Sequence, residues 1–496
     1  MSDLFDKTIA AGLLATVAFT TLAHGAVEAW SAAIFESLIL ILLLLWAIRC
    51  AFQKRIEIRV PMTAFPLAVL LVYAIVQSVV FVDADGQKTS LSIDAEATRG
   101  AATILFFLLA AHLLAANFFA TRERFRMLAN FLIVFGLAFA VFALVQHFTW
   151  NGSFFWLRAT RAGGGMVTGS FVNHNHFSGL MELLIPLPVA LVLANVVRNR
   201  RVLYALAAVM MTMAAIMALS RGGMISLAVG GAFVFAVAIY KSSRDDSGER
   251  FFDAEFDETD EANRLPWFFN LAGAGIIALA IALGTLLVGS EPVLNRITNN
   301  SIVQSGEQAQ NFDNARGWMW RNSWTIFRAN PVFGIGLGAY ETAFPNYADG
   351  DGIRQYGKQF VFDRAHNDYL QILTDTGLIG AGIAGWFIVA LLMSMRRALR
   401  LRNALGSALA IGWSAAIVAL AVHSFFDFNL QLPAIALVFL IIAAAISNLP
   451  LLEIHRMWNQ PRQTMLPPGR EIKLLHAAPE IEIAEIVGEL EVSRRN

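Results

Sequence analysis

Three residues that are far apart in the sequence carry side chains suited to moving a group from an anionic donor. Arg221 and Arg316 have guanidinium groups, each of which can form two parallel hydrogen bonds to phosphate oxygens. His366 has an imidazole, which can take up a proton near pH 7. We predict that these three are catalytic: the guanidinium groups would hold a phosphorylated leaving group, and the imidazole would activate the attacking hydroxyl.

Other polar residues occur in the loops and segment ends around these three. Asparagine and histidine side chains suit sugar hydroxyls, and further arginines suit an anion. We therefore predict a substrate-binding set of Arg161, Asn173, Asn175, His176, Arg321, Asn367 and His423. Two ionisable residues lie inside apolar segments, where such groups are functional candidates. Glu182 could border the site, whereas His112 is equally explained as an interhelical hydrogen-bonding group and is left out of it.

Each main candidate also has a purely structural explanation. Arg221 could be an arginine at a helix end whose charged head reaches water. Arg316 and Arg321 could be solvated surface charges, and His366 could be a loop histidine bonded to its neighbours. For Arg221, function is favoured because a tight external hairpin needs no cation and a lone one there opposes the predicted orientation. For His366, only the neighbouring candidate residues favour function.

Cofactor chemistry finds little support in the sequence. Histidines 174, 176, 366 and 423 lack the carboxylate pattern that usually accompanies a zinc site, so we predict no metal and no cofactor. Cys50 is the only cysteine, which excludes an intrachain disulfide. There is no Walker A sequence, and Gly334-Ile-Gly-Leu-Gly338 lacks the strand and helix of a dinucleotide loop, so we interpret it as a flexible turn.

Composition places these residues in a membrane protein. Of 496 residues, 57% are hydrophobic and only 15% are charged, whereas soluble proteins have about 25% charged residues. The net charge of zero argues against a nucleic-acid partner. We predict an all-α polytopic membrane protein whose partners include the lipid bilayer.

A membrane-spanning helix needs about 20 mostly apolar residues. This rule predicts about twelve spans, at about 8–29, 31–48, 62–82, 100–120, 128–148, 177–197, 202–219, 222–240, 267–288, 376–395, 404–424 and 430–449. The long hydrophilic loop 289–375, between spans nine and ten, is expected to be helical. In it, Arg316 is predicted to open a helix with Asp313 as N-cap, and Trp320, Trp324 and Phe327 recur at helical spacing.

The basic loops predict the orientation, because Lys and Arg concentrate in short cytoplasmic loops. The connections after spans two, four, six and ten share one side if the spans alternate, and their basic residues are Arg49, Lys54, Arg55, Arg59, Arg122, Arg124, Arg126, Arg198, Arg200, Arg201, Arg396, Arg397, Arg400 and Arg402. That side, with both termini, is predicted to be cytoplasmic. The domains are then a transmembrane domain (1–450), an acidic cytoplasmic insert (241–266) and a cytoplasmic tail (451–496).

Taken together, these pieces resemble the O-antigen ligase and polymerase superfamily of bacterial envelope glycosyltransferases. The resemblance covers about 169–433, in order, with the long external loop at 289–375 where the family has it. The matching pieces are the Asn173/Asn175 segment, Ser220-Arg-Gly-Gly223, Arg316 with its tryptophans, Asn330-Pro with Gly334–Gly338, His366-Asn-x-x-Leu370 with Gly377-Leu-Ile-Gly380, and His423-Ser-x-x-Asp427.

The resemblance implies a metal-independent, inverting transfer at the periplasmic face of the bacterial inner membrane. The donor would be a glycan linked to undecaprenyl diphosphate, and the acceptor a hydroxyl of another glycan or glycolipid. It also implies that Arg221 and Arg316 hold the diphosphate and that His366 lies near the acceptor. Other polysaccharide assembly proteins would be further partners. Ligase and polymerase activities both remain open.

Two other kinds of protein fit the same composition. A polytopic transporter would place its polar sites near the bilayer midplane and would show repeat symmetry between its halves. Here the polar groups gather near one external end, and the long loop has no counterpart in the first half. A non-catalytic component of a polysaccharide export machine would tolerate substitution of the arginines and the histidine.

Overall fold

The computed structural model describes residues 2–54, 58–82, 86, 88–160, 165–196, 200–245, 306–348, 350, 353–354 and 362–453. Arg161, the predicted ninth span, the acidic insert beyond Asp245 and the tail beyond Glu453 lie outside these residues. The chain divides into two units, Met1–Ile454 and His455–Asn496, and the second lies wholly outside the described residues.

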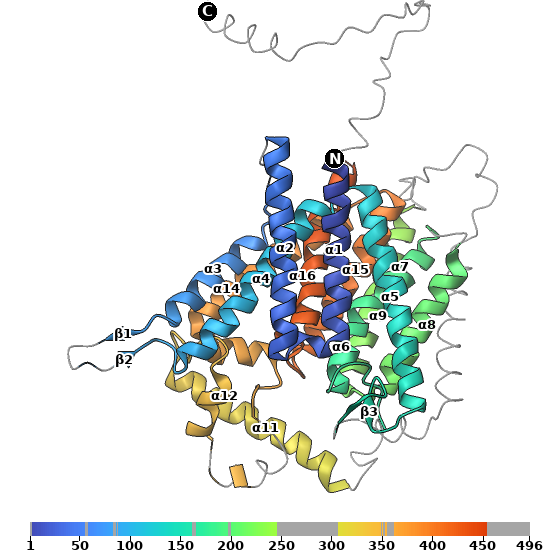
Figure 1. Ribbon diagram of the computed structural model, residues 1–496. Coiled ribbons are helices and arrows are strands. Elements are labelled where there is room, and N and C mark those ends of the chain that lie inside the picture. The colour runs from blue at the N-terminus through green and yellow to red at the C-terminus, as the bar shows by residue number, and fades with distance from the viewer. Residues whose placement is uncertain are drawn as a thin grey trace, which may run out of the picture. The chain divides into compact units, whose positions relative to one another are not determined.

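The described part of the chain is mostly helical (Figure 1). Its α-helices are α1 (Ser2–Leu22), α2 (Ala29–Gln53), α3 (Ala64–Gln77), α4 (Ala95–Phe118), α5 (Arg122–Phe148), α6 (His174–Leu184), α7 (Pro186–Leu193), α8 (Arg201–Met217), α9 (Arg221–Asp245), α11 (Gly306–Ala329), α12 (Tyr340–Ala343), α14 (Asp368–Leu399), α15 (Ala404–His423) and α16 (Pro433–Asn448). Short 3-10 helices are η1 (His24–Ala26), η4 (Phe344–Asn346) and η5 (Asn429–Gln431).

Two small antiparallel hairpins complete the described structure. Strand β1 (Phe81–Val82) pairs with β2 (Lys88–Thr89), with Phe81 opposite Thr89. Strand β3 (Ser153–Phe154) pairs with β4 (Arg158–Ala159), with Ser153 opposite Ala159.

The helices agree with a multi-pass membrane protein. Among the described residues, 8 helical stretches are long and apolar enough to cross a membrane, α6 and α7 together making one of them. Three shorter apolar helices, α3, α8 and α16, fall on further predicted spans. Every predicted span except the ninth therefore coincides with a helix, and the ninth lies outside the described residues.

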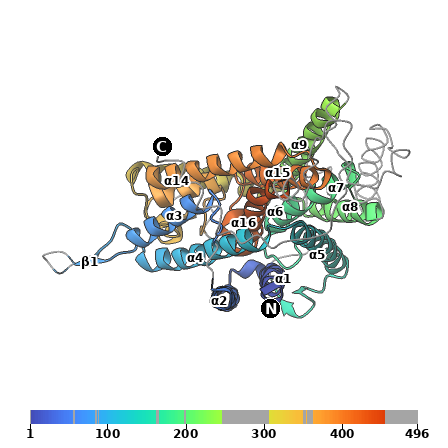
Figure 2. The ribbon, with the colours of Figure 1, turned by 90° about the horizontal axis from the view of Figure 1, so that it is seen from above.

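The most buried helices are those that lead to the polar residues of interest. Within the 18-residue apolar segment of each helix, 83% of α15 and 89% of the α6–α7 stretch is buried. The corresponding share is 22% in α2 and in α9. Figure 2 shows α16 among α4, α6 and α15, with α2 and α9 further out. Small residues permit this close packing: a Cβ on Gly412 of α15 would lie 2.8 Å from the Cα of Leu187 in α7.

Helix α14 consists of two segments that meet at Gly377, whose backbone has φ 61° and ψ −160°. The Gly334–Gly338 turn packs against this point: the amides of Ile335 and Gly336 donate to the carbonyls of Thr374 and Asp375. The amide of Gly338 donates to the Asp375 carboxylate at 3.0 Å. The predicted turn is thus present, and these bonds hold it against α14.

The start of α14 differs from the predicted span. The helix begins at Asp368 rather than near 376, because the Asn367 side chain caps it by accepting from the amide of Leu370 at 2.9 Å. The hydrophilic residues 368–375 therefore belong to the first segment of α14 instead of to a loop.

Helix α11 corrects the predicted position of Arg316. The helix already begins at Gly306, so Arg316 lies within it, and the prediction that Asp313 is the N-cap was wrong. Trp318 and Met319 pack with Tyr340 and Phe344 in a small hydrophobic cluster. The opposite side of the helix leaves Trp324 49% exposed, which suits an aromatic residue at a membrane surface.

Candidate functional site

Two segments that are distant in the sequence meet where α14 begins and α15 ends. We call residues 424–432, between α15 and α16, the Asp427 loop. The amide of Asp368 donates to the carbonyl of Ser424 at 2.9 Å, and the Ser424 hydroxyl donates to the Asp368 carboxylate at 2.9 Å. Asn367 donates to the carbonyl of Phe425 at 3.1 Å. The Asp427 loop is thereby fixed beside His366.

The centre of the site is the carboxylate of Asp427, which is fully buried. One oxygen lies 3.0 Å from Nδ1 of His366 and also accepts from the amide of Phe428 at 2.9 Å. The other lies 3.5 Å from Nη2 of Arg316. A single carboxylate therefore contacts the guanidinium of Arg316 in α11 and the imidazole of His366, two residues before α14.

The charge state of Asp427 determines what His366 can do. Burial alone would raise the pKa of the Asp427 carboxyl, but the hydrogen bond from His366 and the electrostatic interactions with His366, His176 and Arg316 hold that pKa well below its usual range. An ionised carboxylate only accepts, so Nδ1 of His366 carries the hydrogen between them. The other ring nitrogen, Nε2, then has the lone pair that a general base needs in the neutral imidazole.

The backbone of His366 is held in an uncommon conformation, with φ 50°. A non-glycine residue in this left-handed region costs about 1–3 kcal/mol, and such residues gather at functional sites. Its neighbour Ala365 is fixed on both sides: its amide donates to Gln371 at 2.6 Å, and its carbonyl accepts from the Trp320 indole at 2.9 Å. These bonds fix the backbone directly before His366.

A second imidazole, His176 of α6, joins the cluster. Its Nδ1 lies 3.1 Å from the side-chain oxygen of Asn429. The rings of His176 and His366 both contact Phe428 edge-on, with centroids 4.7 and 4.8 Å from that ring. Two imidazoles therefore share the Phe428 ring, which places both predicted residues at the same end of the bundle.

Arg221 reaches the same loop through the backbone that follows it. It begins α9 and is half-buried, and Ser220 caps the helix by accepting from the amide of Gly223 at 3.1 Å. A Cβ on Gly222 would lie 2.9 Å from the Cβ of Phe426. Glycine is therefore needed for this approach, and the residue next to Arg221 touches the residue next to Asp427.

The remaining predicted binding residues divide into three groups. His423 lies one residue before the Asp427 loop, where its Nδ1 is 3.0 Å from Glu182. Asn173 caps α6 by accepting from the amide of Asn175 at 2.9 Å, and Asn175 itself is buried. Arg321 is exposed on α11, about 140° around the helix from Arg316.

These positions separate the residues that the fold brings together from those that it does not. His366, Arg316, His176 and His423 border the Asp427 loop, and Arg221 borders it through Gly222. Asn367 and Asn173 have capping roles, which explain them without a substrate. His112, left out of the predicted site, bonds Thr63 at 2.9 Å and the carbonyl of Leu440 at 2.8 Å, and so links helices as expected.

The predicted site did not include Asp427, which is its most central residue in the structure. Its signal was present in His423-Ser-x-x-Asp427, where a single carboxylate lies between two apolar segments. An acidic residue in that position suggests a loop. Only the packing of the loop on α14 shows that its carboxylate is buried between two basic groups.

The fold and this cluster define a multi-pass helical membrane protein with imidazole, guanidinium and carboxylate groups gathered at one end of its bundle. Residues 206–385 match the O-antigen ligase family, which confirms the resemblance to the O-antigen ligase and polymerase superfamily and indicates glycosyltransferase activity of the O-antigen ligase type. The matched residues include Arg221, Arg316 and His366 and end before His423 and Asp427. No curated protein matches the chain.

Proposed function

We propose that this protein transfers a glycan from undecaprenyl diphosphate to a hydroxyl of a glycan or glycolipid, acting as an O-antigen ligase or a polysaccharide polymerase. The reaction takes place at the periplasmic face of the bacterial inner membrane and needs no metal ion, and both termini are cytoplasmic. The observation that carries the proposal is the buried Asp427 carboxylate, which contacts His366 on one oxygen and Arg316 on the other.

In this mechanism His366 is the general base. Its Nε2 takes the proton of the acceptor hydroxyl as the oxygen attacks the anomeric carbon of the donor sugar. The bond between that carbon and the diphosphate oxygen breaks, and its electron pair leaves with the lipid diphosphate. Attack from the face opposite the leaving group inverts the anomeric centre. Asp427 stabilises the imidazolium that forms, because its carboxylate already accepts from Nδ1.

The two arginines act on the leaving group. Arg316 has only 20% of its side chain exposed and lies beside an ionised carboxylate, so the position of its guanidinium is restricted. Arg221 approaches from the start of α9, whose positive helix end also favours an anion. Negative charge develops on the diphosphate as the glycosidic bond breaks, and fixed donors in a partly dry site stabilise it.

The membrane setting suits a lipid-borne donor. Trp324 and Phe327 of α11 form a ring pair with centroids 5.1 Å apart. Such aromatic residues prefer the headgroup level of a bilayer. Because Arg316 is on the same helix, an α11 anchored in this way would hold its guanidinium at the depth of a lipid diphosphate.

The decisive experiment is glycan transfer by the purified protein, with a lipid diphosphate-linked donor and a chelator of divalent metals present. We expect transfer by the wild type and its abolition in His366→Ala, Arg316→Ala and Arg221→Ala, each of which still inserts into membranes. Arg328→Ala is the matched control, because Arg328 is an exposed arginine of the same helix α11. Full activity in one of the first three variants would remove that residue from the mechanism.

A gene-deletion experiment separates the two activities. Loss of long polymer, with single units still attached to lipid, identifies a polymerase. Polymer that accumulates on the carrier lipid identifies a ligase. Glycan flux across vesicles without any transfer product would instead favour a transporter and overturn the proposal.

A further inference from the structure

The proposed mechanism gives no role to Glu182 and His423, a buried ionisable pair beside the site. Glu182 of α6 is fully buried, and His423 at the end of α15 is 1% exposed. Nδ1 of His423 lies 3.0 and 3.1 Å from the two carboxylate oxygens of Glu182, and the Ser178 hydroxyl donates to that carboxylate at 3.1 Å. Burying two such groups in a membrane protein is costly, so residues of this kind usually serve a function.

The pair lies directly under the first turn of α9. A Cβ on Gly223 would lie 3.0 Å from a carboxylate oxygen of Glu182 and would collide with the Ser178 hydroxyl. A Cβ on Gly222 would lie 3.1 and 3.2 Å from Cδ2 and Nε2 of the His423 ring. The two glycines that follow Arg221 therefore pack directly against this pair. A larger residue at either position would collide with the side chains of α6 or α15.

The pair is also close to the charged groups of the site. His423 interacts electrostatically with Asp427 and Arg316, and His176 interacts electrostatically with His423. The Asp427 loop begins directly after His423. Glu182 and His423 therefore contact the start of α9 on one side, and His423 adjoins the Asp427 loop on the other.

We propose that Glu182 and His423 are positioning residues that fix the first turn of α9 and thereby set where Arg221 meets the donor diphosphate. This inference rests on the proposed function, since it concerns the diphosphate of that donor. The carboxylate holds the imidazole by both oxygens, the imidazole edge supports Gly222, and the carboxylate supports Gly223. Neither residue needs to touch the substrate.

A purely structural bond between α6 and α15 would have the same geometry, so the test must separate the two roles. The first measurement is binding of undecaprenyl diphosphate to the purified protein in detergent. We expect Glu182→Gln and His423→Gln to weaken binding by roughly tenfold, with thermal stability sufficient for purification. His112→Gln is the matched control: it removes a buried imidazole that bonds two other elements, so it lowers stability without changing the dissociation constant.

The second measurement is a double-mutant cycle with Arg221→Lys. If Glu182 acts through Arg221, Glu182→Gln adds little to the loss of binding already caused by Arg221→Lys. Equal losses in both backgrounds would overturn the inference, as would wild-type binding by Glu182→Gln. If Glu182→Gln does not fold, Ser178→Ala takes its place with a smaller expected loss, because it removes one donor to the carboxylate and keeps the pair.

The two proposals fail in different ways. A wild-type protein that binds no undecaprenyl diphosphate and transfers no glycan contradicts the proposed function. A wild-type protein that binds and transfers, together with a Glu182→Gln variant that does both equally well, contradicts only the positioning role.

Discussion

Asp427 and Asp6 are each shared by two basic side chains, at opposite ends of the helices. Asp427 contacts His366 and Arg316. Asp6 of α1 forms ion pairs with Arg49 of α2 and with Arg124 of α5, the latter at 2.8 Å. Asp6 joins three helices through guanidinium groups, which stay charged at any physiological pH. Only the Asp427 cluster contains a group that can give and take a proton.

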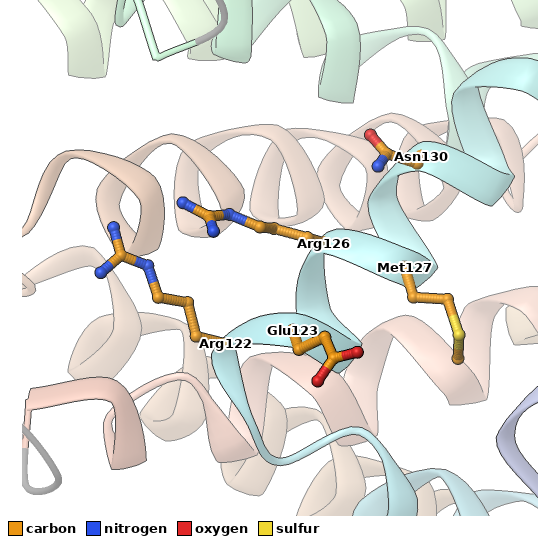
Figure 3. A pocket seen from close by; sticks show the side chains of 5 residues that line it. All are labelled: Arg122, Glu123, Arg126, Met127 and Asn130. Atoms are coloured by element: carbon orange, nitrogen blue, oxygen red, sulfur yellow. The ribbon is translucent and has the colours of Figure 1, made fainter. Parts of the chain in front are cut away.

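The two clusters also differ in how many structural elements contribute residues to their surroundings. On α5, the helix that also carries Arg124, five of the described residues line an open pocket of about 630 Å³, namely Arg122, Glu123, Arg126, Met127 and Asn130. Figure 3 shows the side chains of Arg122 and Arg126 extending to the same side of the helix. The Asp427 cluster instead draws on α6, α9, α11, the segment just before α14 and the Asp427 loop. Basic residues from one helix suit a membrane-facing surface, whereas convergence from many elements suits a site.

The largest predicted effect is the loss of the charge at the centre of the site. Asp427→Asn keeps the shape but lets the amide donate to His366, which disturbs the position of the ring hydrogen. We expect kcat of glycan transfer to fall by on the order of a hundred- to ten-thousandfold, the contribution of a general base. A single-turnover assay with saturating donor measures it, and a fall of less than threefold would show that His366 works without this carboxylate.

The second prediction concerns the shape of the cation beside Asp427. Arg316→Lys keeps the charge but removes the planar group that can bind two phosphate oxygens at once. We expect kcat/KM for the donor to fall by roughly tenfold to a hundredfold, less than in Arg316→Ala. Steady-state kinetics with varied donor checks this, and Arg328→Lys on the same helix serves as control. Equal activity of the lysine and arginine forms would show that only the positive charge at position 316 matters, not the planar shape of the guanidinium.

The third prediction tests the other shared carboxylate. Asp6→Asn leaves two guanidinium groups without their partner, so we expect a loss of stability of about 3 kcal/mol, as for other largely buried pairs. Thermal unfolding in detergent measures it. Activity per folded molecule should stay within about twofold, because this cluster tunes no reacting group. A selective loss of kcat in a stable Asp6→Asn protein would erase the contrast between the two ends.

The smallest effect is expected in the α5 pocket. Arg126→Ala removes one of several basic residues at that end, where single surface substitutions usually change stability by less than about 0.5 kcal/mol. Transfer rates in proteoliposomes should match those of the wild type. A large loss of transfer there would show that this end contributes to the reaction.

Much of the fold could be predicted from the sequence because apolar length is a local property. Each predicted span in the described residues coincides with a helix, and Pro186 and Gly377 mark places where helices divide. Predicted ends were less accurate. The start of α14 depends on the Asn367 cap, and α11 extends ten residues before Arg316, where the sequence has no apolar period to indicate it.

The sequence by itself determined the membrane-protein class and the residue types of the site, since composition, span length and the motifs around Arg221, Arg316 and His366 can be read along the chain. Only the tertiary structure decided the central position of Asp427, the pairing of Glu182 with His423 and the capping roles of Asn173 and Asn367. The physical reason is that burial and hydrogen bonding depend on which distant segments pack together. A carboxylate in a loop looks the same in a sequence whether water or two basic side chains surround it.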